Sequence, residues 1–233
     1  MTVLLVAHGT RNPRGVALIG DLAAAMRERL DDQVAVSFVD VLGPSPSEAL
    51  ATLKLSSPIA VVPAFLGRGY HVRRDIPEHL SRCGVPPTRV SDSLGPSDEV
   101  VETLADRLRA AGRRPGDAVV LAAAGSSDPL SHRDVDSVAH ALSTVVDAPV
   151  EVAFAAPSAK APQYPSVAEA VARLRRRHRR VAVASHLLAP GLFQTRLEGS
   201  GADVVARPLG LHPLIVDRAC ALARSTATEP AAC

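Results

Sequence analysis

Apolar runs of strand length alternate along this chain with longer segments in which apolar residues recur at helical spacing. In the first half, the strand-like runs lie at residues 3–7, 34–39, 59–63 and 89–92. The helical segments follow them, at residues 16–30 and 45–53, after Asp75 and after Ser97. This βαβαβαβα order predicts an α/β fold in which a small, doubly wound parallel sheet carries helices on both faces.

The second half of the chain repeats the order of the first. Residues 8–13 align with residues 124–129. The sequence Ser45-Pro46-Ser47-Glu48, which predicts a helix start with a capping box, has its counterpart in Ser166 and Glu169 after an insertion rich in proline and alanine. A repeat of this length, with the same order of elements, indicates an internal duplication.

The junction between the two copies is marked by a change in composition. Residues 113–116 turn to charge, proline and glycine. The sequence Leu94-Gly95-Pro96 recurs as Leu209-Gly210-Leu211, each time just before the last helix of its half. We therefore predict two similar tandem domains, residues 1–114 and residues 115–233.

Composition and charge narrow the range of partners. The 233 residues are 47% apolar and 21% charged, the balance of a soluble globular protein. The 26 basic and 24 acidic residues leave a net charge of only +2, which gives no bulk attraction to nucleic acid or to an anionic membrane. The basic run Arg173–Arg180 ends a predicted helix, whose dipole favours cations there. We expect neither a nucleic-acid nor a membrane partner.

The ends of the chain and its cysteines suggest a compartment. Residues 1–8 have no basic region and too short an apolar run for a signal peptide, and no segment approaches the roughly 18 apolar residues of a membrane span. Cys83, Cys220 and Cys233 lack the C-x-x-C spacing of a zinc or redox site. We expect a cytoplasmic protein with unpaired thiols.

Two histidines occupy positions with chemical meaning in such a sheet. His8 directly follows the first strand-like run, and His71 lies in the loop that follows the third. In a doubly wound sheet of order 2-1-3-4, strands one and three are neighbours whose following helices leave on opposite faces, which opens the crevice where ligands bind. Imidazoles are common ligands of divalent metals, so the pair predicts a metal site.

The residues around both histidines carry a family resemblance. The segments Leu5-Val6-Ala7-His8-Gly9-Thr10-Arg11 and Gly69-Tyr70-His71-Val72-Arg73-Arg74-Asp75-Ile76-Pro77 resemble the paired signature of sirohydrochlorin chelatases of the CbiX/SirB type. These class II chelatases use no organic cofactor and insert Fe²⁺ or Co²⁺ into sirohydrochlorin on the way to siroheme or cobalamin. The resemblance extends over the whole chain, because long members of the family are tandem duplications.

The resemblance implies a role for particular residues. It makes His8 and His71 the metal-binding and catalytic pair, and it makes Asp40, after the second strand, a further candidate ligand or proton acceptor. A free tetrapyrrole must lose two inner N–H protons while the hydrated ion sheds water, and histidine can serve as ligand and as base. We interpret Asp75, which precedes Ile76-Pro77-Glu78, as a helix cap.

Sirohydrochlorin is a planar ring with eight carboxylates, so its recognition should be electrostatic. Arginine matches carboxylates in a bidentate manner, although solvation is the alternative for each exposed side chain. The candidate substrate-binding residues lie in the two histidine loops and are Thr10, Arg11, Arg14, Arg68, Arg73 and Arg74.

The second half departs from the family pattern. Ala124 stands at the position of His8, and Phe193 stands at the position of His71 when residues 61–72 are aligned with residues 183–194. His186 aligns with Ala64 and matches no motif. We therefore expect one active site, on the first domain, with the second domain as a degenerate copy that forms the opposing wall of the cleft.

Two other functions remain open on sequence grounds. A non-catalytic carrier of metal or tetrapyrrole would need the same ligands as a chelatase. A phosphate-handling turn at residues 8–11 is the second alternative, although the loop has neither a G-x-G-x-x-G motif nor a Walker lysine. The residues leave open which metal is used, which of the two pathways the product enters, and whether the protein is a monomer, which we favour, or a dimer.

Overall fold

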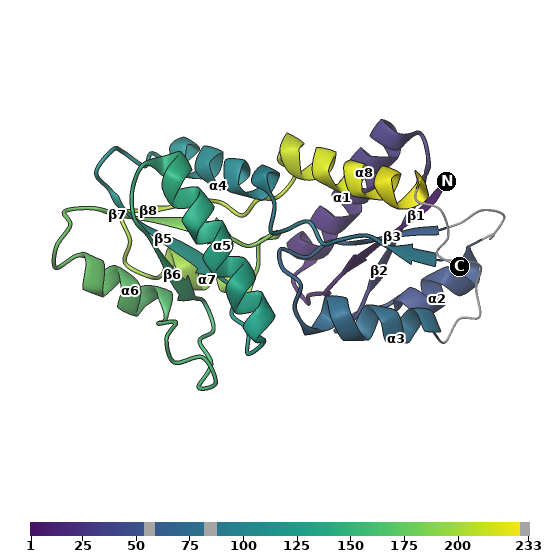
Figure 1. Cartoon of the computed structure of the whole chain (residues 1–233), viewed down its shortest axis with the longest axis horizontal. Coiled ribbons are helices and arrows are strands. Elements are labelled where there is room, and N and C mark those ends of the chain that lie inside the picture. Colours follow the sequence, from purple (N-terminus) through teal and green to yellow (C-terminus); the bar gives the residue numbers. More distant parts are fainter. Residues whose placement is uncertain (54–58, 82–87, 229–233) are drawn as a thin grey trace. The chain divides into compact units, whose positions relative to one another are not determined.

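Each half of the chain builds its own four-stranded parallel sheet. The computed structural model describes residues 1–53, 59–81 and 88–228. Its contacts divide the chain into two compact units (Figure 1). Unit 1 comprises Met1–Gly95 and Pro213–Cys233, and unit 2 comprises Pro96–His212.

The sheet of unit 1 has the strand order β2-β1-β3-β4. All neighbouring strands are parallel, and β1 is in register with β3 from Thr2 opposite Ile59 to Val6 opposite Pro63. The two central strands are buried almost throughout because helices cover both faces, which explains their unbroken apolar sequence. The strands are β1 (Thr2–Ala7), β2 (Gln33–Phe38), β3 (Ile59–Pro63) and β4 (Thr88–Val90).

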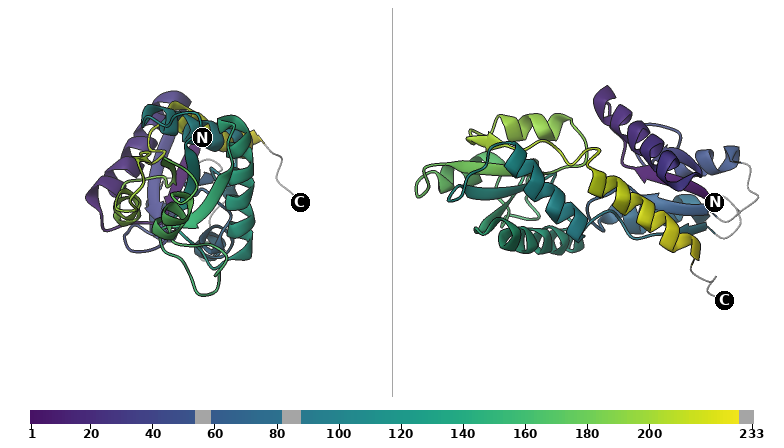
Figure 2. Two further views of the ribbon diagram at one scale, coloured as in Figure 1. Left: turned by 90° about the vertical axis from the view of Figure 1, so that its left-hand side faces the viewer. Right: turned by 90° about the horizontal axis from the view of Figure 1, so that it is seen from above.

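Helices cover both faces of this sheet. Helices α1 (Pro13–Leu30) and α8 (Pro213–Thr228) pack side by side on one face, as seen from above in Figure 2. Helix α2 (Pro46–Thr52) and the short α3 (Ile76–Ser81) lie on the other. A π-helical turn, η1 (His71–Asp75), leads directly into α3. The core beneath α2 and α3 is made of Leu4, Val6, Ala49, Leu50, Ile59, Val61 and Ile76.

Unit 2 has the same topology, with the strand order β6-β5-β7-β8. Its strands are β5 (Ala118–Ala123), β6 (Val150–Phe154), β7 (Val181–His186) and β8 (Val204–Val205). One face carries α4 (Asp98–Ala110) and α5 (Pro129–Val146), and the other carries α6 (Val167–Leu174) and α7 (Leu192–Glu198). The predicted fold class, two similar α/β parts with parallel sheets, is confirmed.

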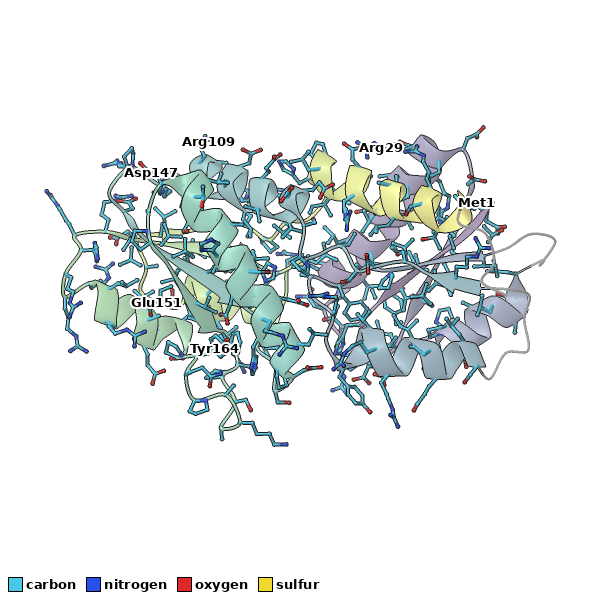
Figure 3. The ribbon with its side chains drawn as sticks, viewed as in Figure 1. Met1, Arg29, Arg109, Asp147, Glu151 and Tyr164 are labelled. Atoms are coloured by element: carbon cyan, nitrogen blue, oxygen red, sulfur yellow. The ribbon has the colours of Figure 1, made fainter. Side chains whose placement is uncertain are left out.

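The predicted helix starts are also observed. Ser45 and Ser166 each accept a hydrogen bond from the backbone three residues on, and Glu48 and Glu169 reach back to complete the two capping boxes. These hydrogen bonds lower the pKa of both glutamates. Ser97 caps α4 as expected. In unit 2, the ring of Tyr164 (Figure 3) anchors the inserted loop before Ser166 by stacking on Phe154.

The compact units differ from the predicted domains 1–114 and 115–233. The last helix of each half packs on the sheet of the other half, α4 on α5 and β7, and α8 on α1 and β3. Arg29 (Figure 3), in α1, pairs with Asp217 of α8 at 3.3 Å. The apolar period of a helix shows that one of its faces is buried, but it does not show which sheet lies beneath that face. The compact units of the structure therefore cut across the sequence repeat, and the division into independent domains 1–114 and 115–233 stays a prediction.

The remaining expectations concern cysteines and membranes. Cys220 is a buried free thiol in α8, whereas Cys83 and Cys233 lie outside the described residues. Across the part of the chain that the structure describes, no helix is both long and apolar enough to cross a bilayer.

Candidate active site

His8 and His71 face each other at the carboxyl edge of the unit 1 sheet. His8 directly follows β1, and His71 opens η1 after β3, the strand next to β1. The centroids of the two imidazole rings are 4.5 Å apart, and the ring planes meet at 78°. The predicted juxtaposition of these two side chains is thus present in the fold.

Gly9 allows the loop after β1 to lie against the loop after β2. Its φ is +100°, and a Cβ atom there would stand 2.0 Å from the backbone oxygen of Asp40. The backbone N–H of Asp40 in turn donates to the carbonyl oxygen of His8 at 2.9 Å. Only glycine combines a positive φ with so close an approach to another backbone segment. Gly9 therefore fixes the backbone position of the adjacent His8.

The loop continues into α1 through side-chain hydrogen bonds. Thr10 Oγ1 accepts from the backbone N–H of Asn12 at 3.1 Å, and Asn12 Oδ1 accepts from that of Arg14 at 2.9 Å. Asn12 thereby caps α1, with Pro13 at its first turn. The hydroxyl of Thr10 stabilises the turn, and its role in substrate binding stays a prediction.

His71 is held from several sides. Its Nδ1 lies 2.5 Å from Oδ2 of Asp75. The ring of Phe65 lies nearly parallel to the imidazole with centroids 6.3 Å apart, and the exposed ring of Tyr70 stands edge-on at 6.1 Å. The imidazole plane is therefore restrained by packing and by a hydrogen bond.

The hydrogen bonds of the two imidazoles select one tautomer for each. His8 Nδ1 lies 3.2 Å from the carbonyl oxygen of Gly9, while His71 Nδ1 contacts a carboxylate. Both partners can only accept, so Nδ1 carries the hydrogen in each neutral ring. The Nε2 lone pairs of both rings are then available to hold a divalent ion or to accept a proton.

Asp40 is close to the pair through its backbone rather than its carboxylate. Oδ1 of Asp40 accepts from the backbone N–H of Val41 at 2.7 Å. Within the described ranges, no group of three or more His, Cys, Asp or Glu side chains is arranged to hold a metal. A third ligand role for Asp40 stays a prediction that this geometry does not strengthen.

The five candidate arginines occupy the two histidine loops as expected. Arg11 and Arg14 follow β1, and the other three are Arg68, Arg73 and Arg74 on the loop and turn after β3. All five side chains are exposed, and Arg74 also lies 3.3 Å from the carboxylate of Glu78. Their exposure is compatible with binding a polyanionic ligand, and their contact with substrate stays a prediction.

Asp75 is the site residue whose position the sequence interpretation missed. It was expected to cap a helix, but it is the last residue of η1 and its carboxylate is bonded to His71. The spacing His-x-x-x-Asp was the available signal, because residues four apart on a helical segment lie on one face.

His186, the histidine at the end of β7, has different surroundings. Its side chain is 5% exposed, and its Nε2 has no hydrogen-bond partner in the described structure. Burial lowers the pKa of His186 from 6.5 to about 4, against the smaller opposing effect of the Asp134 charge. A buried imidazole of this kind is not presented to a ligand as His8 and His71 are.

Comparison with known proteins now identifies the family. The CbiX family model matches residues 2–111 and again residues 118–226, so the chain belongs to the CbiX family. The resemblance seen in the two histidine loops is confirmed. The two matched stretches also correspond to the two copies of the sequence repeat.

Curated relatives are sirohydrochlorin chelatases. The chain is 41% identical over 80 residues to the sirohydrochlorin cobaltochelatase of Methanothermobacter thermautotrophicus, covering 34% of this chain and 56% of that protein. It is 33% identical over 156 residues to the sirohydrochlorin ferrochelatase of Bacillus subtilis, covering 62% of this chain and 58% of that protein. The chain thus spans a little over half the length of these relatives.

Solved structures share the fold. SirB from Bacillus subtilis with Fe³⁺ superposes with a TM-score of 0.83 at 24% identity, covering 97% of this chain and 95% of that one. CbiX, described as the terminal enzyme for siroheme biosynthesis in denitrifying bacteria, gives a TM-score of 0.70 at 19% identity, covering 97% and 99%. At these identities the likeness establishes the fold alone.

Proposed function

We propose that this protein is a sirohydrochlorin chelatase, a lyase that inserts Fe²⁺ or Co²⁺ into sirohydrochlorin. The observation that carries the proposal is the His8–His71 pair, with ring centroids 4.5 Å apart at the carboxyl edge of the sheet. Curated relatives bear the names of sirohydrochlorin cobaltochelatase and ferrochelatase. The metal is a substrate in this reaction, and no organic cofactor is required.

The geometry suits the two demands of metal insertion. The ion must be held weakly enough to leave, and two histidine nitrogens form a smaller ligand set than a closed structural site. The macrocycle gives up two N–H protons as it takes up the ion, and an Nε2 lone pair can accept a proton. Because His8 is exposed and the side chain of His71 is 36% exposed, ligand exchange with water is possible.

Substrate recognition falls to the exposed arginines of the same loops. A planar polycarboxylate presents anions around its rim, and guanidinium groups bind carboxylates through paired hydrogen bonds. In this proposal, Arg11, Arg14, Arg68, Arg73 and Arg74 orient the ring above the two histidines. Cytoplasmic location, a monomeric state and the role of unit 2 as a wall of the cleft stay predictions.

A non-catalytic carrier is the second candidate, because it would use the same two imidazoles. Anaerobic incubation of sirohydrochlorin with Fe²⁺ or Co²⁺ and catalytic amounts of protein, followed by macrocycle absorbance, separates the two functions. We expect many turnovers per protein, and we expect His8→Ala to lose roughly 100-fold or more in rate. The exposed His140 provides the control variant His140→Ala.

Two outcomes would contradict the proposal. A single stoichiometric burst in the wild type would indicate a carrier. Wild-type turnover by a folded His8→Ala protein, with folding checked by circular dichroism, would remove His8 from the reaction.

A further inference from the structure

We propose that Asp75 is a positioning residue, which holds His71 in the tautomer that leaves its Nε2 free for the metal. The inference rests on the proposed function, because it assigns to His71 the role of ligand or base. The juxtaposition that carries it is the 2.5 Å contact between His71 Nδ1 and Asp75 Oδ2.

The backbone of η1 brings the two side chains together. The carbonyl oxygen of His71 accepts from the N–H of Ile76, five residues on, so the turn is wider than an α-helical turn. Residues four apart still share a face of this turn, and both side chains are partly shielded, at 36% exposure for His71 and 24% for Asp75. π-Helical turns are frequently found at functional sites.

The hydrocarbon rings beside His71, those of Phe65 and Tyr70, do not select a tautomer. The rings of Phe65 and Tyr70 restrain the imidazole plane by contact, at centroid distances of 6.3 and 6.1 Å. An aromatic neighbour does not distinguish the N–H from the lone pair on Nδ1. The carboxylate does, because a charged acceptor strongly favours the hydrogen on the facing nitrogen.

His8 shows what the same arrangement looks like with a neutral partner. Its Nδ1 is 3.2 Å from the carbonyl oxygen of Gly9, a longer contact with an uncharged acceptor. The two imidazoles are therefore held unequally. Carboxylate partners of metal-bound histidines fix the ring orientation and raise ligand basicity, and losing one typically reduces metal affinity or activity by about 10–100-fold.

Unit 2 supports a link between Asp75 and His71 rather than a need of the fold. Extending the alignment that places Phe193 at the position of His71 places Leu197 at the position of Asp75. Leu197 is fully buried in α7, in the apolar core beneath that helix. Where the imidazole is absent, the carboxylate is absent as well, and the sheet still forms.

The test uses Asp75→Ala and Asp75→Asn in the full chain, with Asp21→Asn, an exposed acid on α1, as the control. Nitrogen NMR of the metal-free protein reports the tautomer of His71, assigned by comparison with His71→Ala. Titration with Co²⁺ alone, followed by visible absorbance, reports metal affinity without the macrocycle.

We expect the wild type and Asp21→Asn to hold His71 as the Nδ1–H tautomer and to bind Co²⁺ equally. Asp75→Ala should populate both tautomers and weaken Co²⁺ binding by about 10–100-fold. Asp75→Asn preserves the side-chain shape and an accepting oxygen, so it should retain the His71 tautomer and lose less Co²⁺ affinity than Asp75→Ala. This second variant keeps the proposal testable if Asp75→Ala does not fold.

Two results would overturn the proposal. One is a folded Asp75→Ala protein that keeps the His71 tautomer and binds Co²⁺ within twofold of the wild type. The other, should the alanine variant fail to fold, is Asp75→Asn with both readouts unchanged. Lack of turnover by the wild type would overturn the proposed chelatase function instead, and the tautomer measurement would still decide the role of Asp75.

Discussion

The loops at the carboxyl edges of the two sheets share a scaffold and differ in chemistry. Gly9 and Gly125 both have a positive φ, and a Cβ on either would stand 2.0 or 2.3 Å from a backbone oxygen of the next loop. Thr10 and Ser126 make the same hydroxyl contact with the backbone two residues on, at 3.1 and 3.0 Å. The following helix is capped by Asn12 in one unit and Asp128 in the other.

In the proposed function, the reacting groups His8 and His71 and their partner Asp75 lie in unit 1. The corresponding positions of unit 2 hold apolar side chains, with Ala124, Phe193 and Leu197 in place of His8, His71 and Asp75. Contacts found in both units are therefore explained by the needs of the fold. Those found only in unit 1 are the ones to assign to function, and the comparison separates the two classes within a single molecule.

The largest expected effect concerns the exchanged helices. A fragment of residues 1–114 lacks α8, which buries Ile215, Val216 and Ala219 in unit 1. Each large apolar side chain contributes about 1.5–3 kcal/mol when buried, a large part of the stability of a domain. We expect this fragment not to unfold cooperatively on heating, as followed by circular dichroism.

A second fragment that includes α8 tests whether this helix completes unit 1. Residues 1–95 joined through a flexible Gly/Ser linker to residues 213–228 should regain a cooperative transition, because this fusion restores unit 1. If residues 1–114 melt cooperatively and the fusion does not, the division into units is wrong.

The next largest effect is expected at Gly9 and Gly125, the glycines that occupy equivalent positions in the two units. Gly9→Ala and Gly125→Ala should each reduce the free energy of unfolding by about 3 kcal/mol, because both strain a positive φ and press on a backbone oxygen. Gly112 has φ +89° but open space around it, so Gly112→Ala should cost about 1 kcal/mol. Denaturant unfolding measures all three, and equal effects at Gly9 and Gly112 would contradict the close-approach argument.

His186 should make unit 2 sensitive to acid. Its pKa is about 4 in the folded chain and near 6.5 when unfolded, so below pH 6.5 the unfolded chain binds a proton that the folded chain does not. The contribution of neutral His186 to the free energy of unfolding is fully present above about pH 6.5, and it falls by about 3 kcal/mol as the pH drops to 4. His186→Leu should unfold with a shallower pH dependence over this window.

The control for that measurement is the exposed His140. His140→Gln should keep the wild-type slope of unfolding free energy against pH. A His186→Leu slope equal to that of the wild type between pH 4 and 6.5 would show that His186 is not the group that titrates.

The smallest expected effect distinguishes a structural role of the Thr10 hydroxyl in the turn from a role in binding substrate. Thr10→Val and Ser126→Ala each remove one hydroxyl contact with the backbone, which should cost about 1 kcal/mol of unfolding free energy. If the hydroxyl of Thr10 acts only in the turn, the KM for sirohydrochlorin should be the same in Thr10→Val and the wild type. A large rise in KM with unchanged stability would instead place Thr10 in substrate binding.

Much of the fold followed from local pattern. The strand order could be predicted because β1 and β3 have unbroken apolar sequences, which indicate strands buried on both faces. The capping boxes at Ser45 and Ser166 set two helix starts through contacts within four residues. The meeting of His8 and His71 then followed, since adjacent parallel strands end at the same edge of the sheet.

The parts that escaped prediction depend on long-range packing or on an unusual backbone. Nothing in the apolar period of residues 98–110 tells which sheet the helix covers, so the exchange of α4 and α8 could not be foreseen. Asp75 has the sequence context of a helix cap, and its spacing of four residues from His71 indicates a shared face only if residues 71–75 are helical, which the π-helical turn establishes. A wider turn of this kind has no signature in the sequence.

The claim that the chemistry resides in unit 1 is tested most directly by comparing one histidine from each unit. Turnover of Co²⁺ and sirohydrochlorin is measured anaerobically near neutral pH for His71→Ala and His186→Leu, both shown to be folded. We predict that His71→Ala loses roughly 100-fold or more in rate, whereas His186→Leu stays within about threefold of the wild type. Equal loss of activity in both variants would show that unit 2 supplies a reacting group, which would contradict the assignment of the chemistry to unit 1.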